Sequence, residues 1–179
     1  RIPIVLKITR RELESRYGDE EKIGIRNECP YTGDVLEDED IGEGTDCISV
    51  LPNGEQFFIC TNSAKFVVDD LKQGDVYGFA NEDNPVTNSE VSSGEGHDFA
   101  VIGGRYIVDL WISHFTGCEE QVVYDLKNPQ DAAKIKEIFG DPEKWSVMMP
   151  GVGFVKPDEP GYPSNKKLKA WAENSLELG

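Results

Sequence analysis

The most regular hydrophobic pattern of the chain is a pair of apolar runs on either side of Gly103-Gly104. The first run extends from His97 to Ile102 and the second from Arg105 to Trp111, and both are rich in β-branched and aromatic residues. Two such runs around a short glycine turn are typical of a β-hairpin. The pattern therefore predicts two adjacent central strands.

The polar residues of this hairpin are its chemically informative feature. Asp109 lies within the second apolar run, and a buried carboxylate is costly unless a partner pairs with it. A two-residue turn would place His97 and Asp109 on opposite faces, whereas a three-residue loop beginning at Ile102 would place them directly across from each other. The hairpin is therefore either a plain core element with an edge aspartate or the support of a histidine oriented by a carboxylate.

A candidate nucleophile lies upstream of the hairpin. Residues 57–59 have the composition of a short strand, and Cys60 then begins a segment in which apolar residues recur at helical spacing. The free amides and the macrodipole of a helix N-terminus favour a thiolate, which is the nucleophilic form of cysteine. The alternative is that Cys60 is simply a small buried residue of an amphipathic helix.

The order Cys60, His97, Asp109 resembles the core of papain-like and transglutaminase-like cysteine enzymes, with the cysteine at a helix start and the other two residues on a hairpin. The string from His97 to Asp109 is most similar to compact bacterial versions, including papain-fold toxin or effector domains and protein deamidases. The resemblance covers about residues 55–112 and is weakest around the cysteine. It implies a nucleophile at Cys60, a base at His97, an orienting acid at Asp109, and an α+β fold whose nucleophile-bearing helix packs on an antiparallel sheet.

Four further residues are candidates for the site. Gln56 lies shortly before Cys60, and papain-like enzymes use an upstream glutamine as an oxyanion-hole donor, although at a different spacing. The polar loop at residues 81–95 leads directly to His97, so we expect it to gate substrate access through Asn84 and Glu95, or else to be a mobile insertion. His114 is the other histidine of the chain and the competing base.

The remaining pattern predicts a single domain over residues 1–179, with a core at about 46–126 and a C-terminal helical region at about 128–179. Residues 18–46 show little apolar periodicity and should form an acidic surface excursion, and residues 149–163 should be irregular. The other expected elements are strands at 2–8, 74–79 and 121–124, a hairpin at 47–59, and helices at 9–18, 128–140 and 164–178.

Composition narrows the possible partners. The chain has 18 Lys and Arg against 34 Asp and Glu, a net charge of −16, so it should not bind nucleic acid, and a protein or peptide substrate is more plausible if it is basic. No apolar run reaches membrane-spanning length, and no leader segment is recognised, which favours a cytoplasmic protein or a delivered effector. The cysteines at 29, 47, 60 and 118 lack the close spacing of zinc ligands, so we expect no metal and no cofactor.

These observations predict a cysteine-dependent enzyme that acts on an amide or acyl bond: a peptidase, a glutamine deamidase or an acyl transferase. The sequence does not choose among these reactions, and it leaves the oligomeric state open. The alternative is a non-catalytic acidic binding or structural module, such as a phage or immunity-type protein, that keeps the hairpin as part of its core.

Overall fold

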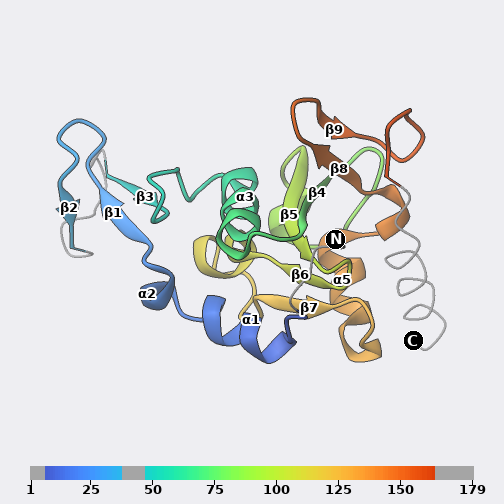
Figure 1. The fold of residues 1–179 in the computed structure, drawn as a ribbon, viewed down its shortest axis with the longest axis horizontal. Coiled ribbons are helices and arrows are strands. Elements are labelled where there is room, and N and C mark those ends of the chain that lie inside the picture. Colours follow the sequence, from blue (N-terminus) through green and yellow to red (C-terminus); the bar gives the residue numbers. More distant parts are fainter. Residues whose placement is uncertain (1–6, 38–46, 164–179) are drawn as a thin grey trace, which may run out of the picture.

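An antiparallel six-stranded sheet forms the centre of the fold (Figure 1). The computed structural model describes residues 7–37 and 47–163. The sheet has the order β7-β6-β5-β4-β8-β9, with β4 at Asp75–Ala80, β5 at Gly96–Ile102, β6 at Tyr106–Val108, β7 at Val123–Asp125, β8 at Ser146–Met149 and β9 at Gly153–Val155. Together with the helices packed against it, this sheet makes the chain an α+β protein, as predicted.

Helices α1 (Arg10–Tyr17) and α3 (Cys60–Leu71) cover one face of the sheet. Leu13 of α1 and Val67 of α3 are fully buried against Ala100 of β5 and Val108 of β6. The spacing of apolar residues predicts both helices, because each presents one apolar stripe to the sheet. Thr9 caps α1 as expected, since its Oγ1 accepts a hydrogen bond from the Glu12 amide at 3.2 Å. Helix α3, which begins with Cys60, is thus packed on the sheet.

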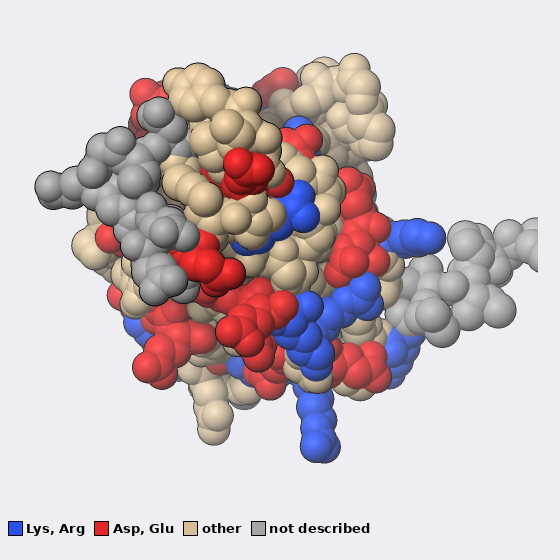
Figure 2. All heavy atoms as spheres, turned by 90° about the vertical axis from the view of Figure 1, so that its left-hand side faces the viewer, with Lys and Arg blue, Asp and Glu red and all other residues tan. Residues whose placement is uncertain are grey.

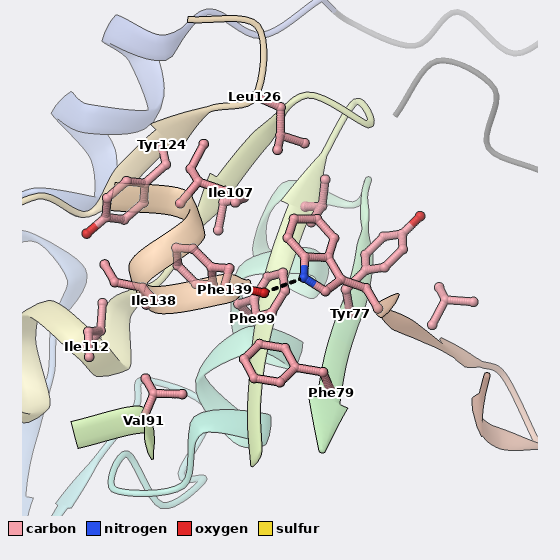
Figure 3. Packing of buried hydrophobic residues seen from close by; sticks show 14 residues of the cluster. Tyr77, Phe79, Val91, Phe99, Ile107, Ile112, Tyr124, Leu126, Ile138 and Phe139 are labelled. Carbon is pink, nitrogen blue, oxygen red and sulfur yellow. Dashed lines mark hydrogen bonds between the residues drawn. The ribbon is translucent and has the colours of Figure 1, made fainter. Parts of the chain in front are cut away.

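The opposite face is covered by α5 (Ala132–Phe139), which continues from the 3₁₀ turn η3 (Pro129–Asp131). Figure 3 shows Phe79 and Phe99 from the sheet packed with Phe139 from α5. Trp145 closes this cluster, and its indole Nε1 donates a hydrogen bond to the Phe139 carbonyl at 2.8 Å. Phe79, Phe99 and Phe139 of this cluster contact the ring of His97, which lies at the start of β5.

The register of the β5–β6 hairpin differs from both predicted registers. Ala100 pairs with Val108 and Ile102 with Tyr106, so the three-residue loop is Gly103 to Arg105 and not Ile102 to Gly104. Both glycines take left-handed conformations, with φ of 63° and 64°, which glycine adopts without strain. The loop still contains an odd number of residues, so His97 and Asp109 lie on the same face of the sheet, as in the three-residue alternative. They are diagonal neighbours and are not directly opposed.

A second, smaller sheet extends to the side of the main one (Figure 1). It has the order β2-β1-β3, formed by Arg26–Glu28 (β1), Val35–Leu36 (β2) and Ile48–Val50 (β3), and it follows the short helix α2 (Glu20–Ile23). Residues 18–37, the described part of the predicted surface excursion, are mostly exposed, but they contain short regular elements that the sequence pattern did not indicate. Strands of two or three residues are too short to show alternation. In the predicted hairpin at 47–59, β3 pairs with β1, and the second strand is reduced to one bridge between Val50 and Gln56.

The C-terminal part of the described chain also differs from its prediction. Strands β8 and β9 form a hairpin at residues 146–155, within a region expected to be helical or irregular, and they extend the main sheet beyond β4. The remaining short helices are the α-helical turn α4 (Ser89–Ser92), the π-helical turn η2 (Trp111–Phe115) and the 3₁₀ turn η4 (Pro142–Lys144). The predicted helix at 164–178 and most of the strand at 2–8 lie outside the described residues. In the described ranges no helix has the length and hydrophobicity to cross a membrane.

Candidate active site

His97 and Asp109 form a buried pair at one end of the sheet. The imidazole Nε2 lies 2.5 Å from Asp109 Oδ2, and the two side chains are 1% and 2% exposed. The second carboxylate oxygen, Oδ1, accepts a hydrogen bond from the Ile112 amide at 3.0 Å. Asp109 therefore uses one oxygen to stabilise the helical turn that follows β6 and the other to hold the histidine ring.

Aromatic side chains surround the His97 ring and restrict its orientation. The Trp111 ring lies 5.1 Å from it between centroids, and Phe139 stacks on it at 5.8 Å with an interplanar angle of 23°. Phe79 and Phe99 contact it edge-on or tilted, at 6.5 and 5.8 Å. Among these rings, the hydrogen bond with Asp109 fixes the orientation of the imidazole.

Cys60 is the first residue of α3 and is half-buried. The preceding residue, Ile59, is the N-cap and makes no side-chain capping bond. Ser63 stabilises the approach to the helix instead, because its hydroxyl lies 3.1 Å from the Phe57 carbonyl and 3.0 Å from the Ile59 carbonyl. The amides of the first helical turn are therefore not capped by an N-cap side chain at the point where the thiol stands.

Cys60 and His97 line the same cleft, which has a volume of about 680 Å³. Burial alone would lower the pKa of His97, but the charge and hydrogen bond of Asp109, followed by the interaction with Cys60, outweigh it and raise the pKa to about 10. The other ring nitrogen, Nδ1, is buried and makes no hydrogen bond within normal geometry to any described residue. Contacts between catalytic groups often tighten only when substrate binds. The structure thus brings together all three residues of the predicted triad.

One cleft residue that the sequence reasoning missed is Asp98, the neighbour of His97 on β5. The Thr61 hydroxyl donates a hydrogen bond to Asp98 Oδ2, which links the first turn of α3 to the strand. Asp98 Oδ1 lies over Gly78 of β4, where a Cβ atom would come within 2.0 Å of it. Strand alternation could have indicated that Asp98 faces α3, but the need for glycine at position 78 is visible only in the paired strands.

The other candidates from the sequence lie in different places. Gln56 is exposed in the bridge to Val50 and does not line the cleft. Asn84 is buried and structural in its contacts, since its side chain donates to the Phe139 carbonyl at 3.0 Å and accepts from the Asp141 amide at 2.9 Å. Glu95 is exposed on the wall of the cleft. The loop 81–95 is therefore anchored at Asn84, while its last residue contributes to the cleft.

The competing base, His114, is engaged elsewhere. Its Nε2 donates a hydrogen bond to the Tyr17 carbonyl at 2.6 Å, and its Nδ1 lies 3.7 Å from Glu20. It does not line the cleft. Within residues 7–37 and 47–163, no group of three or more His, Cys, Asp or Glu side chains is arranged to hold a metal ion.

No protein-family model, curated protein or solved structure matches this chain. The residues of the cleft are therefore the basis for assigning a function.

Proposed function

We propose that this chain is a cysteine-dependent enzyme of the papain-like or transglutaminase-like kind, acting on an amide or acyl bond. The observation that carries the proposal is that Cys60 and His97 line one cleft while Asp109 holds the far nitrogen of His97. A nucleophile, a base and a group that orients the base form the constellation used for acyl transfer on several unrelated folds. The resemblance seen in the sequence supports the same three roles.

In the proposed reaction, Cys60 acts as a thiolate beside the His97 imidazolium. The sulfur attacks the carbonyl carbon, an S–C bond forms, and the carbonyl π electrons move to the oxygen. His97 Nδ1 then donates its proton to the leaving amine as the C–N bond breaks, which leaves a thioester on Cys60. Water or a second amine, deprotonated by His97, attacks the thioester and releases the thiolate.

The transient oxyanion needs hydrogen-bond donors close to Cys60. The backbone amides at the start of α3 fit this role, because the N-cap position is occupied by Ile59 and not by a polar residue that would cap them. Gln56, which is exposed and outside the cleft lining, is not needed as a donor in this scheme. The variants of the reaction, peptide hydrolysis, glutamine deamidation and acyl transfer, differ in the amine that leaves and in the group that resolves the thioester.

Alkylation of the cysteines by iodoacetamide near neutral pH, mapped by mass spectrometry, tests the proposal. We expect Cys60 to react roughly tenfold or more faster than Cys118, although Cys118 is the exposed thiol, because Cys60 interacts with the His97 imidazole. A His97→Gln variant should lose this preference.

His114→Gln is the matched control, because it removes the other, partly buried histidine without touching the cleft. It should keep the Cys60 preference, and thermal unfolding should show that both variants are folded. If folded His97→Gln protein labels Cys60 as fast as the unmodified chain does, the thiolate mechanism is excluded and the chain is a binding module.

A further inference from the structure

The walls of the cleft carry an excess of acidic groups. Five carboxylates and two ammonium groups line it, which gives a formal charge of −3. The Lys156 ammonium lies 3.5 Å from the Asp83 carboxylate, so these two opposite charges largely cancel, and the excess comes from the other four carboxylates against Lys144. The acidic residues are Asp83, Glu95, Asp98, Glu143 and Asp158.

The acidity of the cleft matches that of the whole chain, which has 34 Asp and Glu residues against 18 Lys and Arg. Figure 2 shows one face of the molecule, on which acidic side chains lie beside Lys and Arg side chains. What distinguishes the cleft is its shape, because charges of one predominant sign along a concave wall concentrate the field inside it.

Asp98 is the carboxylate closest to the proposed chemistry along the chain. It follows His97 on β5, and its side chain accepts a hydrogen bond from the hydroxyl of Thr61, the residue after Cys60. Burial outweighs the Thr61 hydrogen bond and the charges of His97 and Lys65, so the pKa of Asp98 is raised above its usual value. A further cation in the cleft would stabilise the charged carboxylate in this partly desolvated position.

The ring nitrogen of His97 that is not held by Asp109 fits a substrate amide at Cys60. His97 lines the cleft, and its buried Nδ1 makes no hydrogen bond of normal geometry to the described residues and has Cys60 as its neighbour. This nitrogen is therefore placed for the proton transfers of the proposed reaction. A cleft of about 680 Å³ that also contains Cys60 has room for a peptide side chain and the amide next to it.

We infer that the cleft selects a cationic acyl substrate: a peptide segment with a Lys or Arg side chain adjacent to the amide that Cys60 attacks. The ammonium or guanidinium group pairs with Asp98, and the exposed carboxylates Glu95 and Asp158 attract it at the rim. The inference rests on the proposed function, because that function places the reacting amide at Cys60.

Peptides that carry a chloroacetamide group in place of the reacting amide test this inference. Three peptides differ only in the neighbouring residue, which is Lys, its uncharged isostere norleucine, or Glu. We expect Cys60 to react with the Lys peptide roughly tenfold faster than with the norleucine peptide and slowest with the Glu peptide, and this preference should decrease between about 0.05 and 0.5 M salt as screening increases.

Variants then locate the source of the preference. Asp98→Asn should reduce the ratio of Lys to norleucine rates several-fold, and Glu95→Gln combined with Asp158→Asn should reduce it less. The rim variant also guards against misfolding, because both of its positions are exposed. Asp69→Asn removes the same charge from an exposed position of α3 outside the cleft and should leave the ratio unchanged.

The outcomes separate the two proposals. Equal rates for the Lys and norleucine peptides at a Cys60 that still reacts preferentially with iodoacetamide would overturn the cation selectivity and leave the enzyme proposal standing. A preference that falls equally in Asp69→Asn and Asp98→Asn would show long-range attraction by the whole protein and would also overturn it. Fluorescence anisotropy of unreactive Lys and norleucine peptides on a Cys60→Ala variant should show the same preference, even if the chemistry fails.

Discussion

The indole Nε1 of Trp111 donates a hydrogen bond to the carbonyl of Phe58 at 3.0 Å. Trp111 follows Asp109 by two residues and packs on the His97 ring, while Phe58 precedes Cys60 by two residues. This single bond therefore connects the segment that carries the proposed nucleophile to the segment that orients the proposed base. It is the kind of supporting contact that catalytic groups need to keep their distance and angle.

Replacing Trp111 with Phe tests this relationship. The variant keeps an aromatic ring against His97 but loses the indole N–H, so the alignment of Cys60 and His97 should loosen. We expect the rate of Cys60 alkylation to fall several-fold, while the free energy of unfolding decreases by only about 1 kcal/mol, the typical net value of one hydrogen bond.

Trp145→Phe provides the matched comparison for this variant. It also loses an indole hydrogen bond, from Nε1 to the Phe139 carbonyl, but Trp145 is fully buried in the core and does not line the cleft. It should lower stability at least as much and leave the alkylation rate unchanged. Equal losses of reactivity in the two variants would mean that Trp111 acts only through general stability.

Asp109→Asn should make stability depend differently on pH. The pKa of His97 is raised from 6.5 to about 10, so the stabilisation that this pair provides is fully present below pH 6.5 and is lost as the pH rises through the raised pKa. Removing one partner of a buried pair costs about 3–5 kcal/mol. The difference in unfolding free energy between the original chain and Asp109→Asn, measured in urea, should therefore be large at about pH 6 and smaller at about pH 10.

Asp131→Asn controls for the loss of a buried carboxylate as such. Asp131 is buried and forms an ion pair with Arg10, with 2.7 Å between Oδ2 and Nη1, and the arginine remains charged throughout this pH range. The cost of this substitution should be the same at both pH values. A cost of Asp109→Asn that is equally independent of pH would show that His97 is not held as an imidazolium.

The sequence allowed the three central residues to be predicted because each carries a local signal. Cys60 begins an amphipathic segment, and His97 and Asp109 are polar residues inside apolar strands, where a partner is needed. The sequence left the parity of the hairpin loop open, and only the three-residue alternative put His97 and Asp109 on one face. The register could not be derived, because two adjacent glycines fit a two-residue turn, the first two positions of a three-residue loop or its last two.

The cleft, in contrast, depends on contacts between distant segments. Its far wall comes from residues 143–158, which the sequence pattern described as helical or irregular. Strands β8 and β9 are three or four residues long, so their alternation is too brief to be recognised, and only pairing with β4 brings them beside His97. The acidic lining could therefore not be inferred from the order of residues alone.

The glycine at position 78 offers a last test of how the cleft is built. A Cβ atom there would lie 2.0 Å from Asp98 Oδ1 and 3.2 Å from the His97 carbonyl oxygen, so the main obstacle is a side chain and the lesser one is backbone. Gly78→Ala should lower the free energy of unfolding by about 1–3 kcal/mol, the range for overpacking a buried site. It should also reduce the preference for Lys peptides, because the displaced Asp98 no longer faces the cleft correctly.

A double-mutant cycle separates the clash with Asp98 from other effects of the added methyl group. In an Asp98→Ala background the carboxylate is gone, so Gly78→Ala should cost clearly less than in the original chain. Gly96→Ala is the comparison, because its Cβ would come within 2.1 Å of the Phe79 carbonyl oxygen, a backbone obstacle that Asp98→Ala cannot relieve. Its cost should be the same in both backgrounds. If Gly78→Ala costs as much without Asp98 as with it, position 78 is glycine because of the backbone and not because the cleft needs a carboxylate there.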